Sequence, residues 1–92
     1  MKKSSSLGTF NNSGLVYDNH CGLSTAVFFA SADATEFILW DNKEVADGYE
    51  LLHVYMNTGS FPFTPAKPKA CQNGIWLEIV KGTGGVTIDI EP

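Results

Sequence analysis

The segment Cys71–Glu91, CQNGIWLEIVKGTGGVTIDIE, carries the clearest folding signal because it contains two stretches of alternating apolar residues. Every second position is apolar in both stretches: Ile75, Leu77 and Ile79 in the first, and Val86, Ile88 and Ile90 in the second. A period of two is typical of strands with one buried face. The glycine-rich segment 81–85 between them has the composition of a turn, so we expect the two strands to form a β-hairpin. A second sheet must cover their apolar face.

Further short stretches with strand character lie upstream, separated by turn residues. We expect strands at 7–10, 15–17, 23–30, 35–40, 49–56 and 60–63. In the strand 23–30 we expect one face to be formed by Leu23, Thr25, Val27 and Phe29. Prolines at 62, 65 and 68 exclude the segment 60–70 from the centre of a sheet. We therefore expect 60–63 at a sheet edge and 64–70 as extended, polyproline-like chain.

These seven or eight short strands predict an all-β protein with a single domain. The expected architecture is a two-sheet antiparallel β-sandwich of jelly-roll or Greek-key type. Residues 1–12 are predicted to be an N-terminal arm with a short edge strand, and residues 13–92 the sandwich itself.

Charged residues make up only 17% of the 92 residues, whereas hydrophobic residues make up 43%. So few charges indicate that part of the surface is buried against partners. The net charge is −4 and arginine is absent, so we expect no nucleic-acid binding. No segment approaches the roughly 20 apolar residues that span a bilayer, and the N-terminus has no apolar signal region. We therefore expect no membrane association. We expect the protein to be made in a reducing cytoplasm.

The sequence offers two weak combinations for chemistry. Asp18, His20 and Cys21 could ligate a metal if Cys71 and His53 completed the set, but the paired ligand spacing of zinc sites is missing. A cysteine with His53 as base could hydrolyse a substrate, but nothing in the sequence brings the two together. We therefore expect no enzymatic activity and no metal or other cofactor. Both cysteines are expected to be free thiols.

Aromatic and apolar residues outside the polar turns are the candidates for partner contact. Phe61 and Phe63 flank a proline and would form an adhesive patch if they were exposed together. The aromatic residues Trp40, Tyr49, Tyr55 and Trp76 could line a sugar-binding surface, although such residues more often fill a core or an inter-subunit contact. The partner-contact candidates are Leu7, Phe10, Trp40, Phe61, Pro62, Phe63, Pro65 and Trp76.

From Ser13 onward, the order of these signals resembles the small all-β accessory structural proteins of tailed bacteriophage virions. The matching pieces are SGLVY at 13–17, the strand at 23–29, FILWDN at 37–42, NGIWLEI at 73–79 and GTGG at 82–85. The resemblance implies a capsid decoration (cement) protein that binds and stabilises the assembled shell. It implies the major capsid protein or other virion subunits as partners, a homo-oligomer such as a trimer, and a place on the capsid surface after synthesis in the host cytoplasm. It brings no catalytic residue.

Two other functions remain open at this point. One is an accessory role in a phage tail or fibre. The other is a carbohydrate-binding β-sandwich module that uses the tryptophans as stacking platforms.

Overall fold

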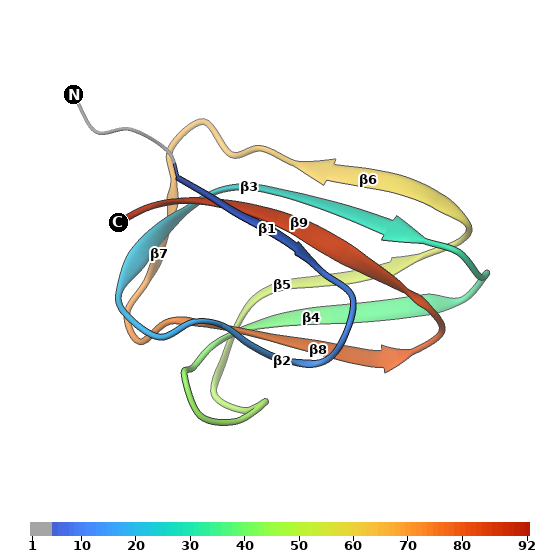
Figure 1. The fold of residues 1–92 in the computed structure, drawn as a ribbon, viewed down its shortest axis with the longest axis horizontal. Helices are drawn as coiled ribbons and strands as arrows, with labels where there is room; N and C mark the ends of the chain where they lie inside the picture. The colour runs from blue at the N-terminus through green and yellow to red at the C-terminus, as the bar shows by residue number, and fades with distance from the viewer. Residues whose placement is uncertain (1–4) are drawn as a thin grey trace.

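The computed structural model describes residues 5–92, which form nine strands in two antiparallel sheets packed face to face (Figure 1). One sheet contains β1 (Ser5–Phe10), β3 (Cys21–Ala30), β6 (Gly59–Phe63), β7 (Lys69–Cys71) and β9 (Gly84–Glu91). The other contains β2 (Gly14–Tyr17), β4 (Thr35–Asp41), β5 (Tyr49–Met56) and β8 (Ile75–Lys81). The predicted all-β sandwich is confirmed. The first four residues of the predicted N-terminal arm lie outside the described residues.

The strand order is that of a jelly roll. The five-stranded sheet has the order β1-β9-β3-β6, and the four-stranded sheet has the order β2-β8-β4-β5. Strands β6 and β7 pair with successive parts of β3, residues 26–30 and 21–23, so they form one edge strand that is interrupted by the proline segment 64–68. Counted in this way, eight strands wind through two sheets, as in other jelly rolls. Residues 5–92 include no helix that could cross a membrane.

The predicted hairpin between the last two strands is wrong. Strand β8 pairs with β2 and β4, whereas β9 pairs with β1 and β3 in the opposite sheet. The turn between them therefore crosses from one sheet to the other, and Ser31 fixes it by donating its backbone N–H to the carbonyl of Thr83 at 2.9 Å. Both sheets turn an apolar face to the same core, so alternation alone looks identical for a hairpin and for a crossing connection.

The predicted faces of β3 are correct only at its beginning. Leu23 is buried, but Ala26, Phe28 and Ala30 are the buried residues further along, and Phe29 is exposed. The register against β9 shifts between Leu23 and Thr25, which is a β-bulge. Because a bulge adds one residue to one strand, every later side chain moves to the opposite face.

The core lies between the sheets and is fully apolar at its centre. The rings of Phe28 and Phe37, one from each sheet, have centroids 5.3 Å apart, and neither side chain is exposed. Most of the predicted inward residues of β8 and β9 join them: Ile75, Leu77, Val86, Ile88 and Ile90 are buried, whereas Ile79 is partly buried against the core. Burying one side chain of this size stabilises the fold by about 1.5–3 kcal/mol, so this shared layer holds the two sheets together.

The edge strands also differ in part from the prediction. The short edge strand expected at 7–10 is confirmed as β1, which starts at Ser5 and pairs with β9. The edge strand expected at 60–63 is confirmed as β6. The segment 64–70 is not polyproline-like throughout, because Lys69–Cys71 pairs with β3 as the strand β7. The three prolines precede this strand, so they do not remove its backbone N–H groups.

Candidate functional site

The outer face of the four-stranded sheet gathers charged and aromatic side chains in three rows across the strands. The register places Trp76 opposite Trp40, and Leu15 and Glu50 extend this row at its two ends. The next row contains Glu78, Ile38 and His53, and the third contains Lys81, Glu36 and Tyr55. We call these ten residues the charged face. Residues in a ladder lie close enough to interact across strands, so this face is a continuous surface.

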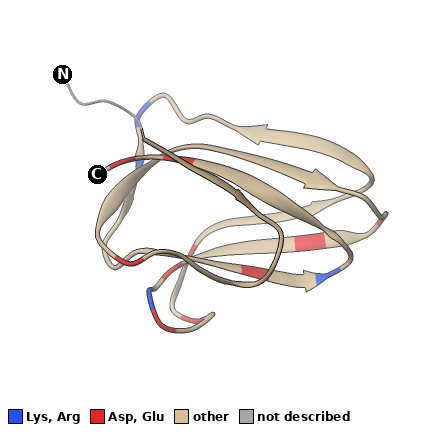
Figure 2. Cartoon of the chain, viewed as in Figure 1, with Lys and Arg blue, Asp and Glu red and all other residues tan. Residues whose placement is uncertain are grey.

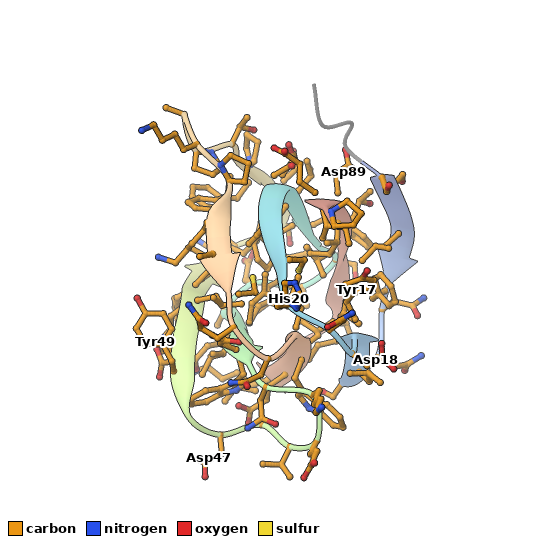
Figure 3. The ribbon with its side chains drawn as sticks, turned by 90° about the vertical axis from the view of Figure 1, so that its left-hand side faces the viewer. Tyr17, Asp18, His20, Asp47, Tyr49 and Asp89 are labelled. Carbon is orange, nitrogen blue, oxygen red and sulfur yellow. The ribbon has the colours of Figure 1, made fainter. Side chains whose placement is uncertain are left out.

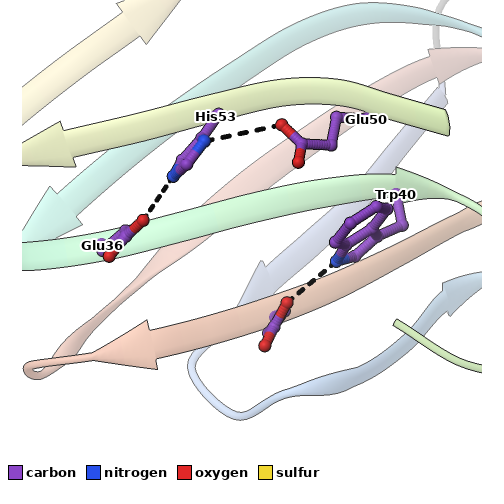
Figure 4. A network of polar contacts seen from close by, with 5 residues as sticks. Glu36, Trp40, Glu50 and His53 are labelled. Carbon is purple, nitrogen blue, oxygen red and sulfur yellow. Dashed lines mark hydrogen bonds and ion pairs between the residues drawn. The ribbon is translucent and has the colours of Figure 1, made fainter. Parts of the chain in front are cut away.

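Polar contacts hold half of the charged face in place (Figure 4). The indole N–H of Trp40 donates to Glu78 Oε1 at 3.0 Å. The His53 ring lies between two carboxylates, with Nε2 against Glu36 and Nδ1 at 3.5 Å from Glu50 Oε1. Each acidic side chain is thus held in a defined orientation.

A cation–π contact and one buried aliphatic residue complete the charged face. The Lys81 ammonium lies 4.8 Å from the centre of the Tyr55 ring. Ile38 is only 7% exposed although it points away from the core, because its neighbours in the three rows cover it. Exposed ion pairs stabilise a protein by at most about 1 kcal/mol each, so the arrangement orders the surface more than it stabilises the fold.

The outer face of the five-stranded sheet has a different character. Its outward residues at the centre are Thr9, Thr25, Val27, Phe29, Pro62 and Thr87, which we call the low-charge face. The hydroxyls of Thr9 and Thr87 are hydrogen-bonded across strands at 2.9 Å. Asp89 is the outward residue beside Thr25, and Figure 2 shows few charges along these strands. The sandwich therefore presents one charged and one nearly neutral sheet surface.

The turn before β8 is held by a buried carboxylate at one end of the sandwich. Asp41, at the end of β4, accepts hydrogen bonds from the backbone N–H groups of Gln72 at 2.9 Å and Asn73 at 2.8 Å. The adjoining loop is folded around Asn42, whose side-chain oxygen accepts from the backbone N–H of Glu44 at 2.8 Å. Figure 3 views this end directly and shows Tyr49 at one side of it.

The predicted contact residues fall on different parts of the molecule. Trp40 and Trp76 lie side by side on the charged face, and both are half-buried. Leu7, Phe10 and Phe63 are half-buried against the core. Phe61 is 45% exposed and Pro62 is also exposed, both on the edge strand β6, and Pro65 is half-buried in the following segment. The structure therefore does not bring the eight residues together as one patch.

The residues considered for metal binding or hydrolysis are separated. Cys21 and Cys71 are buried in the five-stranded sheet, whereas His53 lies on the outer face of the other sheet. Asp18 and His20 are exposed at the end of the sandwich (Figure 3). Within residues 5–92 no group of three His, Cys, Asp or Glu side chains could hold a metal ion. Neither cysteine can therefore use His53 as a base in this arrangement.

Sequence reasoning missed the charged face as a unit. Glu36, Ile38 and Trp40 alternate with buried residues, so the pattern of β4 could have assigned them to one outer face. Their neighbours come from β5 and β8, and the pairing of those strands with β4 cannot be predicted from the residue pattern of any single strand.

Comparison of the chain with known protein families, curated proteins and solved structures gave no significant match.

Proposed function

We propose that the protein is a structural component of a phage-type virion, a capsid decoration protein that binds the assembled shell. The observation that carries this proposal is the contrast between the two outer faces of a jelly-roll sandwich. Viral capsid domains are a common use of this fold, although a fold alone does not define a function. The proposal also rests on the sequence resemblance from Ser13 onward.

The low-charge face is the surface that we assign to the shell. Interface cores are depleted of charged residues and enriched in apolar ones, because removing a charge from water is costly. Val27, Phe29 and Pro62 carry no charge, and one carboxylate, Asp89, lies beside this face next to Thr25. On the charged face, by contrast, three glutamates would lose water. The charged face is then left toward solvent and helps to keep the bound protein soluble.

Stabilisation follows from selective binding. A protein that binds the assembled lattice but not free subunits shifts the equilibrium toward the lattice by mass action. Decoration proteins of this kind suit positions at local symmetry axes, so we expect a homo-oligomer, with a trimer as the first state to test.

The test uses two matched variants. Val27→Glu places a carboxylate in the low-charge face, and Val80→Glu places one on the exposed side of β8 in the other sheet. Wild type and Val80→Glu should cosediment with undecorated shells in a fixed ratio, and Val27→Glu should not. Dissociated capsid subunits should bind none of them. Equal binding of both variants would reject the low-charge face, and absence of wild-type binding would reject the decoration function.

A carbohydrate-binding module is the second candidate, and the pairing of Trp40 with Trp76 favours it. Two neighbouring indoles offer a stacking surface, and the carboxylate of Glu78 beside them could accept hydrogen bonds from sugar hydroxyls. Lectin domains also use the jelly roll. Titration with a glycan panel should then change the tryptophan fluorescence, Trp76→Ala should abolish the change, and Val27→Glu should retain it.

A further inference from the structure

Cys21 and Cys71 face each other across the pairing of β3 with β7. They are direct partners in this antiparallel ladder. Partners in such ladders have Cα atoms about 4.5–5.5 Å apart, and disulfides are found at Cα separations of about 4.4–6.8 Å. The backbone therefore places the two thiols at a distance that a disulfide can bridge without rearranging either strand.

The two cysteines differ in exposure and in the acidity of their thiols, although both belong to the buried core. Cys21 is 8% exposed and lines a surface hollow with Gly22, Pro68 and Glu91, whereas Cys71 is 2% exposed. The neighbouring thiol of Cys71 lowers the pKa of Cys21. The Cys21 thiol and burial raise the pKa of Cys71. Because the thiolate is the nucleophile and Cys21 lines the hollow, Cys21 is the cysteine that we expect to attack a reagent there.

We propose that Cys21 and Cys71 form a modification site that a low-molecular-weight disulfide oxidises to an intramolecular disulfide. The Cys21 thiolate attacks one sulfur of the reagent, forms a mixed disulfide and expels the first small thiolate. The Cys71 sulfur, after losing its proton to solvent, attacks the Sγ of Cys21 and expels the second. The two protons end on the two small thiols, so one reagent disulfide is reduced while one protein disulfide forms.

The bond would lock the weakest part of the five-stranded sheet. In the part of the chain that is described, β7 has only three paired positions, all with β3, and the proline segment 64–68 separates it from β6. A covalent link at the end of this short ladder holds that segment against the sheet. It also closes a loop of about fifty residues, which restricts the unfolded chain.

Oxidised glutathione is the probe, and intact mass is the first readout. The wild-type protein should lose the mass of two hydrogen atoms without gaining glutathione, and it should run as a single chain on a non-reducing gel. Dithiothreitol should restore the reduced mass. Its melting temperature should rise by at least about 10 °C in the oxidised form.

Two single substitutions test the order of events. Cys71→Ser should stop at a stable mixed disulfide on Cys21, whereas Cys21→Ser should remain largely unmodified while it is folded. The inference fails if wild type accumulates the mixed disulfide or stays reduced at an excess of reagent that oxidises an unfolded control. Equal glutathionylation of both single variants would overturn the assignment of Cys21 as the attacking thiol.

Discussion

The carboxylate of Asp41 accepts a hydrogen bond of 2.8 Å from the backbone N–H of Asn73, which ties the end of β4 to the turn that leads into β8. The same carboxylate accepts from the backbone N–H of Gln72, and Asp41 is only 7% exposed. Buried backbone N–H groups need partners, and here one side chain supplies them for a turn outside the strand ladders. The carboxylate thus provides the hydrogen-bond acceptors that a neighbouring strand would otherwise provide.

Asp41→Asn should therefore destabilise the protein by about 2–3 kcal/mol, because charge-assisted bonds are lost and an amide N–H₂ faces backbone donors. Urea denaturation followed by circular dichroism measures the change. Asp47→Asn is the control, since the carboxylate of exposed Asp47 accepts a local bond from the N–H of Gly48 and the substitution leaves its backbone carbonyl unchanged. It should cost under about 1 kcal/mol. Equal losses in both variants would contradict the special role of Asp41.

Substitution of Gly74 by alanine should lower the stability of the fold far more than substitution of Gly59. Both glycines have positive φ angles, 149° and 139°, so alanine is strained at either position. A Cβ at Gly74 would also lie 2.3 Å from the carbonyl oxygen of Tyr17, whereas a Cβ at Gly59 meets nothing within 4 Å. We expect Gly59→Ala to cost about 1–2 kcal/mol and Gly74→Ala at least about twice that. Similar midpoints in urea would show that the turn at Gly74 relaxes freely.

Removal of the Phe37 ring should nearly abolish folding. Phe37 is fully buried and contacts Phe28 in the opposite sheet. Phe37→Ala should cost about 3–5 kcal/mol because it deletes apolar contacts and leaves a cavity, and Phe37→Leu should cost clearly less. Phe61→Ala is the matched control on an exposed residue and should change stability by under about 1 kcal/mol. Thermal melts of the three variants measure this, and any other order of melting temperatures would contradict the prediction.

Asp33 should make the protein sensitive to acid. The backbone N–H and the hydroxyl of Thr58 both donate to its Oδ1 at 3.0 Å, and together they lower the pKa of this carboxyl. A pKa that is lower when folded contributes stability above the unfolded value of about 3.9, and this contribution is lost as the pH falls through the folded pKa.

The difference in melting temperature between wild type and Asp33→Asn should thus be largest near about pH 6 and shrink below about pH 4. Thr58→Ala removes one donor but keeps the backbone N–H, so it should give an intermediate pH dependence. A difference that stays constant or grows on acidification would contradict this sign.

The buried face of a strand without a bulge could be predicted from the sequence, whereas the bulge in β3 and the pairing of the strands could not. The alternation of Val86, Ile88 and Ile90 correctly identified the inward residues of β9. The bulge after Leu23 escaped prediction because it is a property of the β3–β9 ladder and not of β3 alone. The same reason explains the wrong hairpin, since either sheet would bury the apolar residues of β8.

The candidate site was predictable only as separate residues. Trp40 and Trp76 were recognised as aromatic candidates, but their contact depends on the register between β4 and β8, which are distant in the sequence. The low-charge face is built from β1, β3, β6 and β9, so it exists only once the topology is known. The low overall charge indicated that such a surface was needed but not where it would lie.

The central position of β9 has a consequence for how the chain acquires its structure. This strand joins β1 to β3, which are both synthesised long before it. A ribosome-bound chain that lacks β9 therefore holds two strands of the five-stranded sheet with unsatisfied edges and an uncovered apolar layer. Pairing between such distant segments is slow. The five-stranded sheet can therefore be completed only after β9 has left the ribosome, and until then the exposed apolar layer makes the nascent chain prone to aggregation.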